Sequence, residues 1–328
     1  MKKCLLTATF GEEELQILKE HTQVTRGGWV ITGKKTPSLE MAEIVGDNEI
    51  LIVELDNIGR EVFENSPHLK LIGCCRGNPV NVDLKAATEF GIPVLYTPAR
   101  NAIAVAELTI AMMVNVARNV GPSYLNLKAG KWGIDGVIPF TYYKGIELAE
   151  KTIGLVGLGA IGRVLAERLK PFEMKILIYD PYISDEEIQK YGQRATLEEV
   201  LRESNFISLH CTVTEETRGM IGKEQFALMR KDAFLINTSR AVVTDREALI
   251  EALQNKKIAG AALDVYHEEP LSPDDPILKL DNAFITPHIG GATFDVERHQ
   301  SRIILTDILR WLEGKQPVNV ANPEVLRM

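Results

Sequence analysis

Three short stretches in the second half of the chain carry side chains suited to reducing a keto acid. "INTSRA" contains Arg240, "ALDVYHEEP" contains Asp264 and Glu269, and "ITPHIGG" contains His288. An arginine can hold a substrate carboxylate through its planar fork, and a histidine can protonate a carbonyl oxygen. A carboxylate behind the ring can fix the orientation of the imidazole. Each stretch follows an apolar run typical of a strand, so we expect these side chains to converge outside the carboxyl ends of one sheet.

A glycine-rich stretch upstream, "TIGLVGLGAIGRVL", predicts a dinucleotide site. Gly157, Gly159 and Gly162 form the pattern G-x-G-x-x-G between a predicted strand and a predicted helix. The first glycine permits a tight turn, the second lets the backbone approach a pyrophosphate, and the third allows close packing of helix and strand. Asp180 ends the next predicted strand, where a carboxylate accepts ribose hydroxyls and repels a 2′-phosphate. We therefore expect NAD rather than NADP.

Simpler interpretations exist for each feature alone. A glycine-rich turn can be followed by an aspartate by chance, Arg240 can be a surface ion-pair residue, and His288 can be structural. All of these features occur together, with Arg240 and His288 following a dinucleotide fingerprint, and this combination favours an active site.

Composition narrows the classes of function. The 328 residues carry a formal net charge of −8, which argues against a nucleic-acid partner. The most apolar stretch, 102–117, contains Glu107 and is shorter than a membrane span. Four cysteines occur without a CxxC or a Cys/His cluster at zinc spacing, so no metal site is predicted. The start of the chain lacks a signal-peptide pattern, and we expect a cytoplasmic protein with no membrane partner.

Strand-like and helix-like segments alternate along the chain, which predicts α/β units with mostly parallel sheets. Four strand patterns occur in the first hundred residues and six more from residue 152 onward. Residues 83–90 and 102–117 read as helices, and the second is apolar all round, as expected of a helix buried between domains. Residues 121–148 show no clear period and are expected to lack regular structure. The aromatic residues of this segment suggest an arm packed on another subunit or a wrap over its own domain. Residues 296–312 read as a final helix that returns to the first domain.

Several long motifs resemble the D-isomer-specific 2-hydroxyacid dehydrogenase family, which includes phosphoglycerate, glycerate/hydroxypyruvate and D-lactate dehydrogenases. The motifs are "LKLIGCCRG", "YTPARNAIAVAELT", "EKTIGLVGLGAIGR", "NTSRAVVTDREAL", "ALDVYHEEP", "TPHIGGAT" and the final "PVNVANPEVL", and the resemblance covers nearly the whole chain. The resemblance implies two doubly wound α/β domains. A Rossmann NAD-binding domain, residues 104–295, would be inserted into a flavodoxin-like substrate domain of residues 1–103 and 296–328. It also implies a homodimer and reversible reduction of a small 2-keto acid by NADH. Within a homodimer, residues 121–148 would be the dimerisation arm.

The resemblance also implies residue roles. Arg240 would bind the substrate, Glu269 would be the carboxylate partner of the histidine, and His288 would be the acid/base. Asp264 would contact the nicotinamide carboxamide. The full set of expected cofactor residues is Gly157, Gly159, Ala160, Ile161, Gly162, Asp180, Cys211, Thr238, Asp264 and Gly290.

The sequence departs from the family in the stretch "CCRGNPVNVD". Many relatives have Arg-Ala-Gly-x-Gly-x-Asp there, whose backbone amides hold the substrate carboxylate. Pro79 has no N–H, so this cup of amides is expected to be incomplete. Cys74 and Cys75 are expected to be buried packing residues. The expected substrate-binding residues are Arg76, Gly77, Asn78, Arg100, Arg240 and His288.

Arginine side chains in place of amides imply a more charged or more hydroxylated acid, either phosphorylated or sugar-derived. The alternative from another class is an NADH-sensing corepressor of the same fold, which binds partners without turnover. A formate- or phosphite-type dehydrogenase is a further alternative, although such enzymes do not usually carry the "EEP" partner of the histidine in this arrangement.

Overall fold

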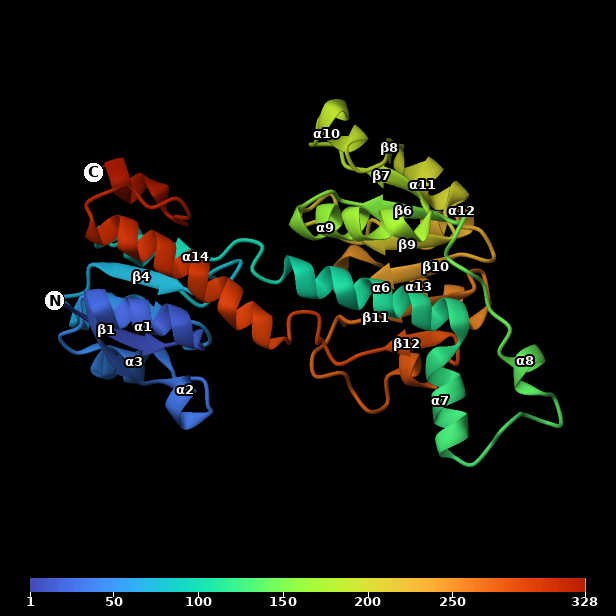
Figure 1. The fold of residues 1–328 in the computed structure, drawn as a ribbon, viewed down its shortest axis with the longest axis horizontal. Helices are drawn as coiled ribbons and strands as arrows, with labels where there is room; N and C mark the ends of the chain where they lie inside the picture. Colours follow the sequence, from blue (N-terminus) through green and yellow to red (C-terminus); the bar gives the residue numbers. More distant parts are fainter. Residues whose placement is uncertain (328) are drawn as a thin grey trace. The chain divides into compact units, whose positions relative to one another are not determined.

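The computed structural model describes residues 1–327, which form two compact units (Figure 1). Unit 1 consists of Met1–Asn101 together with the residues from Thr293 onward, and unit 2 is Ala102–Ala292. The domain boundaries expected from the sequence, after residues 103 and 295, fall slightly later than these joins.

Unit 1 is built on a five-stranded parallel sheet in the order β2-β1-β3-β4-β5. This is the order of flavodoxin-like sheets. The strands are β1 (Lys2–Thr7), β2 (Thr22–Arg26), β3 (Ile50–Val53), β4 (Leu71–Cys74) and β5 (Val94–Tyr96). The helices are α1 (Glu12–His21), α2 (Trp29–Thr32), α3 (Ser38–Val45), α4 (Arg60–Asn65), α5 (Leu84–Glu89), α14 (Phe294–Leu312) and the 3₁₀ turn η4 (Pro323–Arg327).

Two hydrophobic cores lie on the two faces of this sheet. On one face, α1 and α14 pack over the strands, with Leu15, Leu18 and Ile304 fully or almost fully buried. This confirms the prediction that the last helix returns to the first domain. The other face carries a separate core that includes Met41 of α3 and Val62 of α4.

Cys74 and Cys75 have opposite orientations at the end of β4. Successive side chains of an extended segment point to opposite faces of a sheet, and the two cysteines accordingly join different cores. Both are fully buried and free, and burial raises the pKa of each thiol. The prediction that they are packing residues is confirmed.

Unit 2 is built on a seven-stranded parallel sheet in the order β12-β11-β10-β9-β6-β7-β8. The strands are β6 (Thr152–Val156), β7 (Lys175–Tyr179), β8 (Gln193–Arg194), β9 (Phe206–Leu209), β10 (Phe234–Asn237), β11 (Gly260–Leu263) and β12 (Ala283–Ile285). Read from β8, the order follows the doubly wound dinucleotide-binding sheet with one further strand. The predicted fold class, two doubly wound α/β units, is confirmed.

Helices cover both faces of the second sheet. One core contains side chains of α6 and α9, and the opposite core contains side chains of α11, α12 and α13. The helices are α6 (Ala102–Arg118), α7 (Val120–Lys128), α8 (Pro139–Tyr142), α9 (Ala160–Leu169), α10 (Asp185–Gln189), α11 (Leu197–Glu203), α12 (Lys223–Leu228) and α13 (Arg246–Gln254). The 3₁₀ turns are η1 (Lys170–Phe172), η2 (Ala241–Val243) and η3 (Pro276–Lys279).

Helix α6 confirms the apolar helix predicted at 102–117. Within unit 2 it packs against α9 and the strands β10, β11 and β12. Among residues 1–327, no single helix has the length and hydropathy needed to cross a membrane. The bent pair α6 and α7 meets that test only when its two helices are taken together.

The prediction that 121–148 lacks regular structure was wrong. Its first part is the nine-residue helix α7, and a short helix, α8, follows. Pro122 lies in the first turn of α7, where a missing N–H leaves no hydrogen bond unmade. Neither helix has a buried residue. A helix that buries no side chain needs no apolar face, so the sequences of α7 and α8 carry little amphipathic period from which to predict them.

Candidate active site

The loop between β6 and α9 has a shape that only glycines permit. Gly157 has φ = +101°, and a Cβ there would lie 2.7 Å from the backbone nitrogen of Cys211. A Cβ at Gly162 would lie 2.5 Å from the Gly157 carbonyl oxygen. No heavy atom lies within 4 Å of a Cβ placed at Gly159. The first and third glycines are thus required by packing, and the second leaves open space beside the backbone.

Helix α9 begins at this open space. Gly159 is its N-cap residue and supplies no side-chain acceptor to the first turn. Ala160 is exposed and Ile161 is half-buried, so unpaired N–H groups of the first turn face outward. The N-terminus of a ten-residue helix also carries partial positive charge. These features fit the pyrophosphate of a dinucleotide.

Asp180 follows β7 and is fixed beside the glycine loop. One carboxylate oxygen accepts the Leu158 N–H at 2.8 Å, and the other accepts the Tyr182 N–H at 3.0 Å. The side chain is buried, and each oxygen keeps a second lone pair. The carboxylate can therefore accept ribose hydroxyls, whereas its charge disfavours a 2′-phosphate.

Two further expected cofactor residues follow neighbouring strands of the same sheet. Thr238, after β10, is buried and shares a 3.0 Å hydroxyl–hydroxyl hydrogen bond with Thr109 of α6. Cys211 follows β9 and is half-buried, and burial raises the pKa of its thiol. The adjacent His210, which was not predicted as a site residue, has its Nε2 2.8 Å from the Ser208 hydroxyl. Burial lowers the pKa of His210 to about 4, so its imidazole is neutral near pH 7.

Glu269 and His288 are directly paired. The Nδ1 atom of His288 lies 2.7 Å from a carboxylate oxygen of Glu269. The other oxygen accepts the backbone N–H of Tyr266 at 3.0 Å. His288 has φ = +53°, a left-handed conformation that is uncommon for a residue other than glycine. Both side chains remain partly exposed.

The charge state of Glu269 decides which ring nitrogen of His288 carries a proton. Burial alone would raise the pKa of Glu269. The opposing effects together are larger, so the pKa is lowered: the carboxylate accepts hydrogen bonds from His288 and Tyr266, and the positive charges of His288 and Arg240 act on it. The carboxylate is therefore ionised near pH 7 and accepts hydrogen bonds only. Nδ1 of His288 must donate to it, which leaves Nε2 for a ligand.

Arg240 lies close enough to Glu269 for its charge to act on that carboxylate. Its side chain is exposed, and its Nη1 donates to the Ser239 carbonyl oxygen at 2.7 Å. No ion pair links Arg240 to an acidic group anywhere in residues 1–327. The guanidinium thus keeps unused donors next to the His288–Glu269 pair.

Asp264 organises the segment that carries His288. Its carboxylate is almost fully buried and accepts the Thr286 hydroxyl at 2.6 Å. It also accepts the backbone N–H groups of Ile289 at 2.8 Å and Gly290 at 2.7 Å. The contact to the nicotinamide carboxamide implied by the resemblance stays a prediction. The role of Asp264 in holding these donors, which lie on both sides of His288, was not predicted from the sequence.

The loop after β4 in unit 1 presents the other expected substrate residues. The Arg76 carbonyl accepts the Thr97 N–H at 2.9 Å, while its half-buried side chain has no polar partner in the described part of the chain. The exposed N–H groups of Gly77 and Asn78 likewise have no acceptor among residues 1–327. These two amides and one guanidinium could hold an anion, as the sequence predicts.

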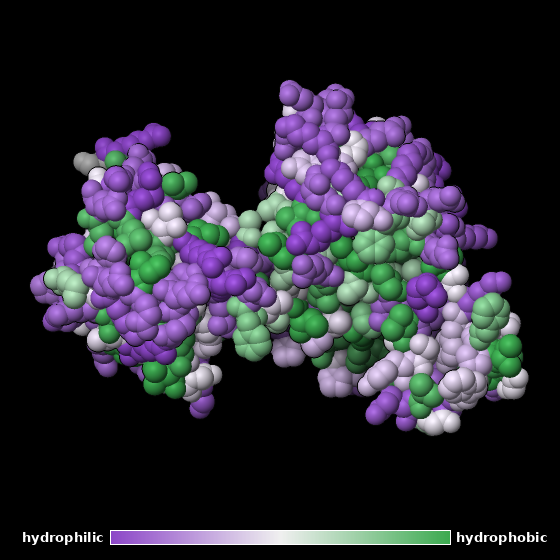
Figure 2. Space-filling model, viewed as in Figure 1, coloured by the Kyte–Doolittle hydropathy of each residue, from purple (hydrophilic) through white to green (hydrophobic). Residues whose placement is uncertain are grey.

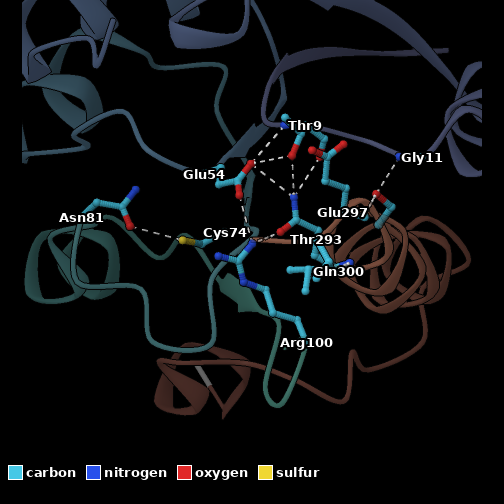
Figure 3. Close-up of polar contacts among 11 residues, drawn as sticks. Thr9, Gly11, Glu54, Cys74, Asn81, Arg100, Thr293, Glu297 and Gln300 are labelled. Carbon is cyan, nitrogen blue, oxygen red and sulfur yellow. Dashed lines mark hydrogen bonds and ion pairs between the residues drawn. The ribbon is translucent and has the colours of Figure 1, made fainter. Parts of the chain in front are cut away.

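Arg100 is less free than the sequence suggested. Its Nη1 donates to Glu54 at 3.0 Å and also to the side-chain oxygen of Gln300, all within unit 1 (Figure 3). Glu54 and Gln300 were not predicted from the sequence, because they are separated from Arg100 by 46 and 200 residues and share no motif with it.

Residues 1–327 contain no group of three or more His, Cys, Asp or Glu side chains that could hold a metal ion. The candidate binding groups described above are the glycine loop, the Arg240–Glu269–His288 group, and Arg76, Gly77, Asn78 and Arg100 of unit 1.

Comparison with known proteins gives a consistent result. The family model described as "D-isomer specific 2-hydroxyacid dehydrogenase, NAD binding domain" matches residues 110–290. The protein YoaD of Bacillus subtilis, named as a 2-hydroxyacid dehydrogenase, is 40% identical over 320 residues, which are 96% of this chain and 92% of that protein. The chain belongs to the D-isomer specific 2-hydroxyacid dehydrogenases.

Two other similar proteins show the range within this family. A D-3-phosphoglycerate dehydrogenase of Methanocaldococcus jannaschii is 39% identical over 98% of this chain, but the chain spans only 60% of that protein. A crystal structure of a D-isomer specific 2-hydroxyacid dehydrogenase from Polaromonas matches with a TM-score of 0.86 and 27% identity, over 98% of this chain and 99% of that one. The chain is thus an NAD-dependent oxidoreductase of this family, and its glycine loop fits that cofactor.

Proposed function

We propose that this dehydrogenase transfers a hydride reversibly between NAD(H) and a 2-keto/2-hydroxy acid, with the D-2-hydroxy acid as the reduced form. The observation that carries the proposal is the 2.7 Å contact between Glu269 and His288, beside an arginine with no acidic partner in the described residues. This combination supplies a proton donor, an orienting group and a carboxylate-binding group.

Each side chain has a separate task in this proposal. Arg240 holds the substrate carboxylate through donors that its backbone contact leaves unused. NADH, when bound, supplies the hydride and its electron pair to the keto carbon. Nε2 of protonated His288 gives its proton to the carbonyl oxygen, and Glu269 holds the ring through Nδ1. In the oxidative direction, neutral His288 takes the hydroxyl proton back.

The proposal assigns substrate binding in unit 1 to Arg76, Gly77, Asn78 and Arg100. It is supported by the unpaired amides and guanidinium of the loop after β4. The substrate is then a hydroxylated or phosphorylated acid, because guanidinium groups take the place of some of the amides that relatives use.

Replacing His288 by asparagine tests the proposal. We expect kcat to fall about 10³-fold, within the range for a lost acid/base group, while the dissociation constant for NADH changes little. His68→Asn, at an exposed histidine of unit 1, is the matched control and should behave like the wild type. Loss of NADH binding with turnover preserved in His288→Asn contradicts the assignment. Tight NADH binding by the wild type without turnover of any 2-keto acid favours the corepressor alternative.

We also propose a cytoplasmic homodimer in which residues 121–148 contact the second copy. Apolar side chains lie at the surface around α7 and α8 (Figure 2), and Trp132 and Phe140 are 76% and 81% exposed. Trp132→Glu combined with Phe140→Glu should give a monomer in light scattering. Phe294→Glu, at an exposed phenylalanine of unit 1, is the control. A wild-type monomer at micromolar concentration contradicts the proposal.

A further inference from the structure

The sheet of unit 1 has a topological switch point between β1 and β3. The chain goes from β1 to β2 on one side and then to β3, β4 and β5 on the other. In open parallel sheets, ligands bind in the crevice outside the carboxyl ends of the strands at such a point. Thr9 lies just beyond β1, and Glu54 directly follows β3. These two residues point toward one another in Figure 3.

Glu54 gathers donors from three separate segments. It accepts the Thr9 N–H at 3.1 Å, the Thr9 hydroxyl at 2.9 Å and the Gln300 side-chain amide at 3.2 Å. It also accepts Nη1 of Arg100 at 3.0 Å. Gln300 is fully buried on α14 and accepts from the same Nη1. The position of Arg100 is thus set by two buried partners rather than by solvent.

Arg100 is held by only one of its three nitrogens. A guanidinium has five N–H groups, and those on Nε and Nη2 have no acceptor within residues 1–327. The side chain is 20% exposed, so this second edge is neither fully buried nor free to move. A guanidinium fixed in this way loses little conformational entropy when it binds a ligand.

The charges around Arg100 disfavour a substrate that carries a second anionic group, such as a phosphate, besides its carboxylate. Its positive charge is balanced by Glu54, and Glu297 of α14 adds another carboxylate. Burial, followed by the negative charge of Glu54, raises the pKa of Glu297. Figure 3 draws Glu297 in the same group of side chains as Thr9 and Glu54. A phosphate beside Arg100 would lie close to these two carboxylates, and like charges repel one another. A hydroxyl group both donates and accepts, and it can use the free edge of Arg100 together with the carboxylate and hydroxyl oxygens.

We propose that Thr9, Glu54, Arg100 and Glu297 of unit 1 form a polyol subsite that binds hydroxyl groups of the substrate. This inference rests on the proposed function and narrows it to hydroxylated, sugar-derived 2-keto and 2-hydroxy acids without a phosphate. Arg100 is the specificity residue, and Gln300 is a positioning residue that acts through it.

Substitution of Arg100 by methionine tests the polyol subsite. The quantity measured is kcat/KM for a four- to six-carbon polyhydroxylated 2-keto acid, divided by kcat/KM for pyruvate. We expect this ratio to fall about 10- to 100-fold, as when a hydrogen bond to a charged group is lost. Arg60→Met is the matched control, because Arg60 pairs with Glu89 on the exposed surface of the same unit. That variant should keep the wild-type ratio.

Two results would overturn the polyol subsite. One is an equal loss for pyruvate and the polyhydroxylated acid in Arg100→Met, which indicates a structural role only. The other is a wild-type enzyme that prefers a phosphorylated acid to its phosphate-free counterpart. Turnover that survives in His288→Asn contradicts the proposed function instead, so the two failures are distinguishable.

Calorimetry provides a readout that needs no turnover. The NAD-loaded wild type should bind D-erythronate at least about tenfold more tightly than D-lactate, and Arg100→Met should remove this difference. Equal affinity of the wild type for the two acids contradicts the subsite, whether or not the enzyme turns over.

Discussion

Each unit has a buried carboxylate at the carboxyl edge of its sheet, and the partners of the two carboxylates differ. Asp264 in unit 2 is 1% exposed, and its partners Thr286, Ile289 and Gly290 lie on one short segment. Glu54 in unit 1 is 8% exposed, and it joins Thr9, Gln300 and Arg100 from distant parts of the chain.

This difference indicates two uses of the same chemical group. The donors to Asp264 are two backbone N–H groups and one hydroxyl, and they have no further donor to offer a ligand. Asp264 therefore fixes the shape of the segment around His288. Among the donors to Glu54 is a guanidinium with an unused edge. Glu54 therefore orients Arg100, whose remaining N–H groups can still bind a ligand.

The largest effect is expected from Asp264→Asn. An asparagine amide would present its own N–H groups to the donors of the segment, so His288 would leave its position beside Glu269. We expect kcat to fall about 10³-fold, as for loss of the acid/base itself. The KM for NADH separates the two roles of Asp264. A small change indicates positioning of His288, whereas a rise as large as the fall in kcat indicates the nicotinamide contact.

Arg240→Lys should have the next largest effect, and it sharpens the contrast between the two arginines. A lysine cannot make a paired contact to a carboxylate, so KM for every 2-keto acid should rise about 10²-fold. Arg100→Lys should raise KM mainly for polyhydroxylated acids. A set of Michaelis constants for pyruvate and a polyhydroxylated acid checks both variants. An unchanged KM in Arg240→Lys counts against its role.

Buried His210 should make the stability of unit 2 depend on pH. Its folded pKa of about 4 lies below the ordinary value of 6.5, so the unfolded chain binds the proton more tightly. The stabilisation is complete above pH 6.5 and is lost as the pH falls toward 4. Between pH 8 and pH 5 the loss should be about 2 kcal/mol. Urea unfolding of the wild type and His210→Asn checks this, and an equal pH dependence in both would rule out His210 as the cause.

The smallest effect is expected from Glu54→Gln. The amide keeps one acceptor for Arg100 but removes the charge that holds it. We expect kcat/KM for polyhydroxylated acids to fall about tenfold relative to pyruvate, as for one charged hydrogen bond. Glu89→Gln, which alters the exposed pair with Arg60, is the control. If both variants give the same ratio, Glu54 does not orient Arg100.

Features that depend on neighbours in sequence were predictable. The glycine pattern and the apolar runs of the central strands each carry a local signal, and the structure has the predicted strands. Of the four edge strands, β5 and β12 were predicted, and β2 and β8 were missed. "TQVTR" contains one strongly apolar residue and "QR" contains none, because an edge strand has little core to bury.

Contacts between distant residues could not be predicted. The pairing of Glu54 with Arg100 and Gln300 depends on the order of strands in the sheet and on the return of α14 to unit 1. The clustering of donors around Asp264 was likewise hidden, because two of them are backbone groups that every residue type possesses.

The return of the chain to unit 1 also sets an order of events during synthesis. Unit 2 is one continuous stretch and can fold once Ala292 has left the ribosome. One face of the sheet of unit 1 then still lacks Ile304 and Ile308, which cover it in the finished protein. Gln300, which orients Arg100, is made 200 residues after it. A growing chain therefore completes its cofactor loop well before it acquires the side chain that positions Arg100.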